Sequence, residues 1–420
     1  MKRNKRISFI ITMLFLTLIH SIKAQEDKVT TRGNEAAPHK EKVDSMTIYG
    51  FAMGDAGYNF NNIDPNWFDV VRPTKLPAFK NQFGSDGNTF FSVRQSRLGV
   101  KSYFNTRFGQ MKTIFEIDMF GVGVDAGETT IRLRHAYGEL GHFGAGQTHS
   151  PFMDIDVFPN ILDYWGPNGM IFFRNVQIRY MPIKKDNSQL TFALERPGAS
   201  QDMGRYSSNI ELDSIEPRFP FPDFSAEYRQ IGKFGYVRLA GIVRRIMWKD
   251  QNPDSLDLSG GTVGWGFNVS TNLNLGKKDI FRGQFVYGRG IQSYINDAPS
   301  DVALKEDVSP SPKPVKAVPV PMISMVAFLE HTWSKKFSTT IGYSMLTIDN
   351  TDGQADDAFH KGQYAIVNLL YYPTDNLMAG IEYQWAKRNN FNDGWSSHLN
   401  KIQVSVKYKF SQYIYRKVNS

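Results

Sequence analysis

The sequence predicts an all-β protein: a transmembrane antiparallel β-barrel of about sixteen strands, with one loop folded inward as a constriction. Three observations predict this fold. Apolar and polar side chains alternate along most of the chain, the N-terminus has the layout of an export signal, and no apolar run is long enough to span a bilayer as a helix. With lipid outside and water inside, a barrel needs strands that are apolar on one face and polar on the other.

The segment 401–410 shows the alternation most clearly. Successive side chains of a strand point to opposite faces, so this segment presents one apolar face with an aromatic end and one cationic, polar face. The apolar set is Ile402, Val404, Val406, Tyr408 and Phe410, and the polar set is Lys401, Gln403, Ser405, Lys407 and Lys409.

Similar segments recur from Met46 onward. In 261–273 the large apolar residues share one parity and the small or polar residues the other, which is inverted relative to a soluble core. The predicted strands begin near residues 46, 88, 108, 128, 143, 169, 188, 222, 234, 260, 280, 321, 337, 361, 376 and 399. Short turns such as 277–279 and 374–375 predict the periplasmic rim, and the long stretches 59–87, 198–221, 291–320 and 349–360 predict the extracellular rim.

The two ends of the chain fall outside the predicted barrel, residues 46–410. Residues 1–24 have a basic cluster followed by an apolar stretch, which predicts a cleaved signal peptide and an outer membrane location. Its removal lowers the net charge from +8 to 8 − 5 = +3, so the basic composition does not indicate nucleic acid as a partner. Residues 25–45 are predicted to be a flexible periplasmic segment and 411–420 an overhang, although Tyr413 and Tyr415 leave open a longer final strand.

Arginines dominate the faces predicted to line the lumen. A guanidinium keeps its charge and matches the geometry of carboxylate and phosphate groups, so such rows favour anionic solutes. Arg94 and Arg97 have opposite parity, which predicts either a bulge or one arginine that points elsewhere. The candidate lumenal residues are Arg94, Arg97, Arg132, Arg134, Arg179, Arg238, Arg244 and Arg282, with Lys101 beside them. The opposing lumenal carboxylates are Glu116, Asp118, Glu195 and Glu382; the alternative is that these charges only pair across the wall.

The segment 150–168 breaks the alternation. Its Phe152, Phe158, Leu162 and Trp165 need burial, which predicts a loop inside the lumen rather than on the surface. The carboxylates Asp154, Asp156 and Asp163 are then predicted to face an arginine row across the constriction.

Signatures of enzymes, cofactors and metal sites are missing from the sequence. His135, His142 and His149 recur every seven residues, a spacing that alternates faces of a strand and does not by itself bring them together. The sequence therefore predicts a protein that is not an enzyme, with no cofactor and no metal.

Three segments resemble a known family: Ile48 to Tyr58, Ser92 to Lys101, and Arg132 to Gly138 leading to Gly146-Gln147-Thr148. They are similar to DcaP-like outer membrane porins, and the resemblance spans roughly 46–410. It implies a homotrimer of sixteen-stranded barrels that passes small anionic solutes, notably dicarboxylates, with Arg94, Arg97, Arg132 and Arg134 in the lumen. Two features depart from the family: residues 25–45 lack a heptad pattern for a coiled coil, and the chain continues past Phe410.

The leading hypothesis is thus an outer membrane porin, set in lipid, for passive diffusion of small anions. A phosphate-selective porin is the alternative within transport. A barrel enzyme or a structural or adhesive barrel would be alternatives from other classes.

Overall fold

A computed structural model describes residues 43–252, 257–306 and 315–417. The chain divides into residues 1–39 and 40–420, and the described residues all belong to the second unit. The predicted signal peptide and most of the predicted periplasmic segment therefore lie outside the described residues. Among the described residues, no helix has the length and hydropathy needed to cross a bilayer.

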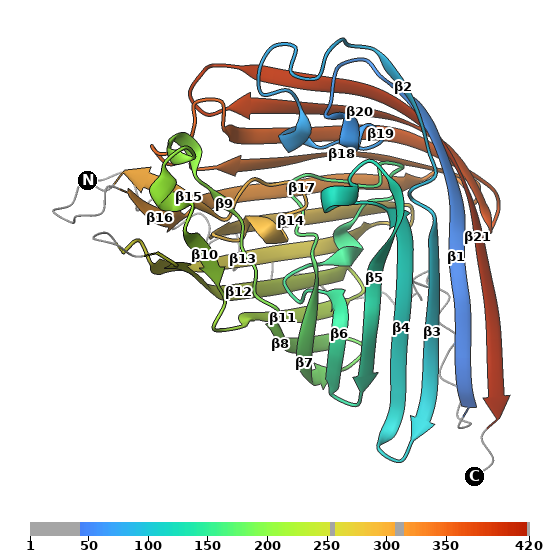
Figure 1. The fold of residues 1–420 in the computed structure, drawn as a ribbon. Helices are drawn as coiled ribbons and strands as arrows, with labels where there is room; N and C mark the ends of the chain where they lie inside the picture. The colour runs from blue at the N-terminus through green and yellow to red at the C-terminus, as the bar shows by residue number, and fades with distance from the viewer. Residues whose placement is uncertain (1–42, 253–256, 307–314, 418–420) are drawn as a thin grey trace, which may run out of the picture. The chain divides into compact units, whose positions relative to one another are not determined.

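The described residues form a closed antiparallel barrel of 16 strands, as predicted (Figure 1). Each strand pairs with its sequence neighbour. The last strand pairs with the first along the whole length of the first strand, from Val43↔Lys417 to Asn59↔Lys401. The strands are β1 (Val43–Asn59), β3 (Arg97–Thr106), β4 (Gly109–Phe120), β5 (Thr129–Leu140), β6 (Phe143–His149), β7 (Arg174–Lys184), β8 (Ser188–Glu195), β11 (Asp223–Gly232), β12 (Gly235–Asp250), β13 (Gly260–Leu275), β14 (Asp279–Arg289), β17 (Pro321–Thr332), β18 (Phe337–Ile348), β19 (Phe359–Thr374), β20 (Leu377–Asn390) and β21 (Ser396–Lys417).

Short strands and 3-10 turns lie at the end of the barrel that carries the long loops. Strand β2 (Asn88–Ser92) pairs with the upper part of β1, and β10 (Ile215–Arg218) pairs with the end of β12. A small separate sheet contains β9 (Gln201–Asp202), β15 (Val302–Glu306) and β16 (Val315–Pro319). Seven 3-10 turns also lie in the described loops: Pro65–Trp67, Pro73–Lys75, Gly123–Asp125, Ile155–Val157, Gly204–Tyr206, Ile210–Leu212 and Gln292–Tyr294.

The faces of the strands follow the predicted parity. In β21, Lys401, Gln403 and Ser405 are buried inside the barrel, whereas Val404 and Val406 are exposed on the outer wall. Most outward side chains of the other strands are likewise large and apolar, as expected of a surface that meets lipid, and β1 is the exception, with small outward residues.

Four boundaries differ from the sequence prediction. The barrel strand predicted near 88 begins at Arg97, because residues 88–92 form only the short β2 and residues 93–96 turn. Strand β1 begins at Val43, inside the segment predicted to be flexible, because β21 continues past Phe410 to Lys417 and pairs with it. Residues 411–417 are therefore strand rather than overhang, in line with the alternative that Tyr413 and Tyr415 extend the strand. The strand predicted near 169 begins at Arg174, because the preceding residues belong to the inward loop: the backbone N–H of Gly169 donates to Ser344 Oγ.

Two irregularities bring residues of opposite parity to the inner face. Residues 93–96 turn between β2 and β3, with Ser96 N–H donating to Val93 O, so Arg94 and Arg97 both point inward. In β5 the register shifts between Glu116↔His135 and Ile117↔Leu133, which makes the intervening Arg134 the extra residue of a bulge.

Gly342 of β18 tests the packing between neighbouring strands. A Cβ at this position would lie 2.1 Å from Cδ1 of the buried Phe328 on β17, so Gly342→Ala is expected to destabilise the barrel by about 1–3 kcal/mol. Urea unfolding, followed by the electrophoretic mobility of unheated protein, measures this change. Gly241→Ala on the outward face of β12 is the control because the nearest heavy atom to its Cβ lies at 3.8 Å; equal stability of the two variants would contradict the packing argument.

Candidate functional site: the lumen and its inward loop

Residues 150–173, between β6 and β7, form a loop inside the barrel, named here the inward loop. Its Phe152 and Leu162 are fully buried, as predicted, and Phe158 and Trp165 pack against a buried cluster that includes Trp67 and Phe120. The segment is therefore not a surface loop.

The first part of the inward loop is bound to the β11–β14 wall. Asp154 accepts hydrogen bonds from Tyr236 Oη at 2.9 Å and Ser270 Oγ at 2.5 Å, and Arg238 donates to the carbonyl oxygens of Pro151 and Met153. Asp156 forms an ion pair with Arg229 at 2.6 Å.

The middle of the inward loop is bound to the β18–β21 wall by two buried carboxylates. Glu382 accepts the backbone N–H groups of Leu162 and Asp163 at 2.8 and 3.0 Å, and also the side chains of Asn368 and Gln384. Asp163 in turn accepts from Val71 N and Tyr364 Oη. Burial raises the pKa of Asp163 to about 7, against the opposing effect of the Lys401 ammonium.

The end of the inward loop meets the arginines predicted on β5. Tyr164 Oη accepts from Arg134 Nη1 at 2.8 Å and also bonds Arg132 and Asp118. Arg132 and Arg134 each bind Asp118 at 2.8 Å, and Arg134 also binds Glu116 at 2.6 Å. The loop thus crosses the lumen from one wall to the other.

The predicted arginines fall into two groups. Arg94, Arg238 and Arg244 are buried and hold loops in place. Arg94 pairs with Asp69, and Arg244 pairs with Asp223 and Asp301. Arg238 pairs with Glu227 and also bonds the inward loop. Arg97, Arg132, Arg179 and Arg282 stay partly exposed inside the barrel, and Arg134 lies buried among them.

The predicted carboxylates differ more from expectation. Asp154, Asp163, Glu195 and Glu382 are each no more than 2% exposed, so they do not face solute across a constriction. Glu195 accepts from Ser150 and Ser225, and Asp156 alone of the three loop aspartates is exposed, with a side chain 46% accessible. The physical reason is that the backbone N–H groups and the Ser150 hydroxyl of the inward loop need acceptors once water is excluded. Asp154, Asp163 and Glu382 accept from backbone N–H groups, and Glu195 accepts from the hydroxyl.

One side of the lumen carries an excess of arginine, and is named here the arginine wall: Arg97, Arg132, Arg134, Arg174 and Arg179 with Glu116 and Asp118. Its formal charge is 5 − 2 = +3. Within the described residues Arg174 and Arg179 form no ion pair; Arg179 donates to Gln177 and the carbonyl of His149, and Arg174 lies 5.4 Å from the ring of Phe172. On the other side, Arg229, Arg238 and Arg282 each have a carboxylate partner.

Sequence reasoning missed Arg174 and the meeting of two histidines. Arg174 lies at the junction of the inward loop and β7, where the alternation of strand faces does not predict the direction of a side chain. His135 and His149 lie with ring centroids 4.7 Å apart. Their spacing alone does not bring them together; they meet because they lie on paired strands and the β5 bulge turns His135 inward beside Thr148. His142 stays apart and binds the carbonyl of Met181.

Further lysines extend the basic surface toward the rim of short turns. Lys101 and Lys407 lie over the rings of Tyr49 and Phe51, at 5.2 and 5.0 Å from the ring centroids, on the inward faces of β3 and β21. Lys409 is two residues beyond Lys407 on the same face and is exposed. Within the described residues, no group of three His, Cys, Asp or Glu side chains could hold a metal ion.

Comparison with known proteins identifies the family. The model of the DcaP outer membrane protein family matches residues 4–305. The chain belongs to this family. It is similar to the crystal structure of the outer membrane channel DcaP of Acinetobacter baumannii, with a TM-score of 0.72 and 21% identity over 87% of this chain and 97% of that one. Membership makes the protein an outer membrane channel of the DcaP type.

More distant porins share the fold. The anion-selective porin from Comamonas acidovorans has a TM-score of 0.56 and 10% identity over 87% of this chain and all of that one (100%). The trimer form of OmpT from Vibrio cholerae has a TM-score of 0.54 and 11% identity, over 87% of this chain and 99% of that one. No curated protein sequence matches the chain.

Glu382 tests the anchoring of the inward loop. Glu382→Gln replaces an all-acceptor carboxylate by an amide whose NH₂ faces hydrogen-bond donors, so we expect a loss of about 1–3 kcal/mol in unfolding free energy and larger fluctuations of single-channel current. Asp375→Asn in the exposed turn between β19 and β20 is the control. Currents as steady as those of the wild type would show that Glu382 does not hold the loop.

Proposed function

We propose that this DcaP-family channel is a porin for passive diffusion of small solutes with a preference for anions, in particular small carboxylates. The observation that carries the proposal is the +3 formal charge of the arginine wall, where Arg174 and Arg179 have no carboxylate partner in the described chain. Guanidinium groups in a partly exposed lumen attract anions and bind carboxylates through paired N–H donors.

A tyrosine and several lysines border the solute path along the arginine wall. Tyr164 from the inward loop narrows the lumen at Arg132 and Arg134, and Lys101, Lys407 and Lys409 continue the positive potential toward the rim of short turns. A solute therefore meets cationic groups on both sides of Tyr164. Since the paired arginines of the β11–β14 wall are neutralised, the charge asymmetry guides anions toward β3–β7.

Ion selectivity tests this proposal. In a potassium chloride gradient across a planar bilayer, we expect a reversal potential that reports preference for chloride. Arg97→Gln with Arg179→Gln should lower the chloride-to-potassium permeability ratio about threefold per charge. A unit charge roughly 7 Å from the ion in water shifts the energies of chloride and potassium by about 0.6 kcal/mol each in opposite directions, and screening by salt at about 0.1 M halves these shifts.

The control removes two arginines from the outer wall, Arg245→Gln with Arg289→Gln. Both are exposed and share the face of the outward Val243 and Tyr287. Cation preference in the wild type, or equal shifts in the two double variants, would contradict a selective role for the arginine wall.

We also propose that the protein is a homotrimer. The outward residues Ala52, Gly54 and Ala56 make this part of the face of β1 nearly flat, and a groove of about 550 Å³ lies there beside the exposed Phe91. A flat apolar face lets the strands of a second copy approach closely.

The oligomeric state tests this interface. Native mass spectrometry is expected to give three chains per particle, and Gly54→Trp is expected to shift the population to monomers by filling the groove. Gly241→Trp, on the outward face of β12, is the control because its Cβ has no close neighbour. A monomeric wild type would overturn the trimer.

A further inference from the structure

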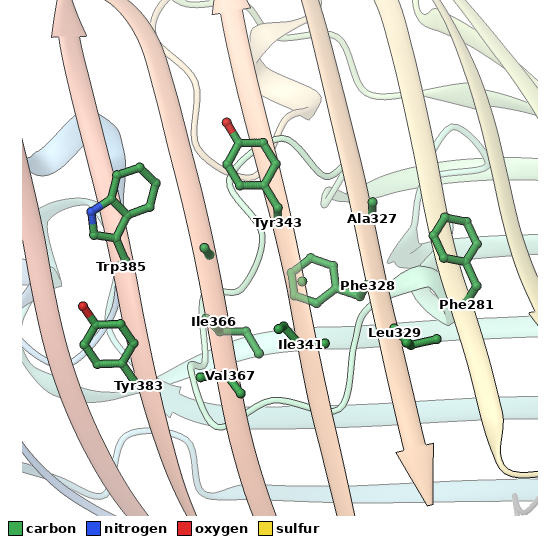
Figure 2. Close-up of a pocket in the computed structure, with 12 residues that line it drawn as sticks. Phe281, Ala327, Phe328, Leu329, Ile341, Tyr343, Ile366, Val367, Tyr383 and Trp385 are labelled. Carbon is green, nitrogen blue, oxygen red and sulfur yellow. The ribbon is translucent and has the colours of Figure 1, made fainter.

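The outer wall formed by β14 and β17–β20 carries a groove of about 550 Å³ (Figure 2). Two rows of outward side chains frame it, each row built from register partners on neighbouring strands. The lower row is Phe281, Leu329, Ile341, Val367 and Tyr383, and the upper row is Ala327, Tyr343, Ala365 and Trp385.

Alternating size in the upper row creates the hollow. Ala327 and Ala365 lie on either side of Tyr343, and Ala365 separates Tyr343 from Trp385, so slots open beside the tyrosine ring. The floor of the groove is thin at Gly342, which has no side chain. The ring of Phe328 occupies the space where a side chain at Gly342 would lie. Such a groove on a lipid-facing wall fits an apolar chain.

Basic residues lie above this groove, toward the rim of long loops. On β19, Gln363 and then Lys361 follow Ala365 in that direction, and on β20 Lys387 follows Trp385. Register pairs Gln363 with Lys387 and Lys387 with the exposed His398 of β21. Gln363 and Lys387 therefore lie about two residues, or roughly 7 Å, above the groove's upper row, and Lys361 lies about four residues, or roughly 13 Å, above it on the adjacent strand.

These cations have no partner in the described part of the chain that would account for them. Within the described residues, the side chains of Lys361, Lys387 and His398 form no ion pair or hydrogen bond, and Asp349, the nearby outward carboxylate, pairs with neither lysine. The amide oxygen of Gln363 accepts a hydrogen bond from the Tyr343 hydroxyl at 2.7 Å, so the NH₂ group of Gln363 remains available to donate. Charges on a lipid-facing wall are tolerated at the interface, where the headgroups lie.

We propose that this wall binds one phosphorylated lipid, with an acyl chain in the groove and the phosphate on Lys361, Lys387 and the amide of Gln363. The polarity of the site matches the orientation of a lipid in the extracellular leaflet: apolar groove toward the midplane, donors toward the surface. Trp385 and Tyr343 stand at the boundary, where amphipathic rings are favoured.

Lipid binding to the full-length protein in detergent tests the proposal, with native mass spectrometry as the measurement. Phosphatidylglycerol and phosphatidylcholine of identical acyl chains are titrated separately. The wild type is expected to bind phosphatidylglycerol at least tenfold more tightly, and Lys361→Gln with Lys387→Gln is expected to remove this preference. Ala365→Trp, which fills the slot beside Tyr343, is expected to weaken both lipids.

Lys335→Gln with Lys336→Gln, in the exposed turn at the opposite rim, is the matched control and should bind as the wild type does. The mobility of unheated protein on electrophoresis confirms that every variant is folded. Equal affinity for both lipids, or an unchanged preference in Lys361→Gln with Lys387→Gln, overturns the headgroup site. Unchanged binding by Ala365→Trp overturns the groove, and displacement of phosphatidylglycerol by millimolar inorganic phosphate shows a plain anion site instead.

Discussion

The closed backbone ladder is the constraint on which the rest of this structure depends. Lipid offers no hydrogen bonds, so every backbone N–H and C=O group of the wall must find a partner in a neighbouring strand. The pairing of β21 with β1 along 17 residues removes the last free edges, and it also explains why the strand continues beyond Phe410. Once the ladder is closed, outward side chains are selected by lipid and inward ones by water and by the loops.

The same hydrogen-bonding requirement shapes the interior. The inward loop brings backbone amides into a space with little water, and the carboxylates of Glu382, Asp163 and Asp154 accept from the groups around them. Arg238 does the converse and donates to loop carbonyls. Much of the lumenal charge therefore holds the loops in place, and the net charge that remains on the arginine wall is the basis of the proposed anion preference. Net charge along one wall is a better guide to solute preference than the number of arginines.

The inner and outer faces of the barrel wall meet different surroundings. Inside, the arginines around Tyr164 present a positive surface to the solute path. Outside, the thin face of β1 and the groove beside Tyr343 are different surfaces on different strands, for which we propose a second copy and a lipid chain as partners. A barrel can carry both because residues that alternate along a strand belong to separate environments.

The sequence by itself determined the number of strands, most of their starts and which face meets lipid, because side-chain alternation is a local property with a period of two residues. It also indicated that 150–168 lies inside, from aromatic residues that need burial. Only the tertiary structure decided which charges are free. Arg134 and His135 both face inward because of a bulge, His149 meets His135 through strand register, and Arg174 stands at a loop junction without parity. Those outcomes depend on pairing between distant segments, which no local pattern records.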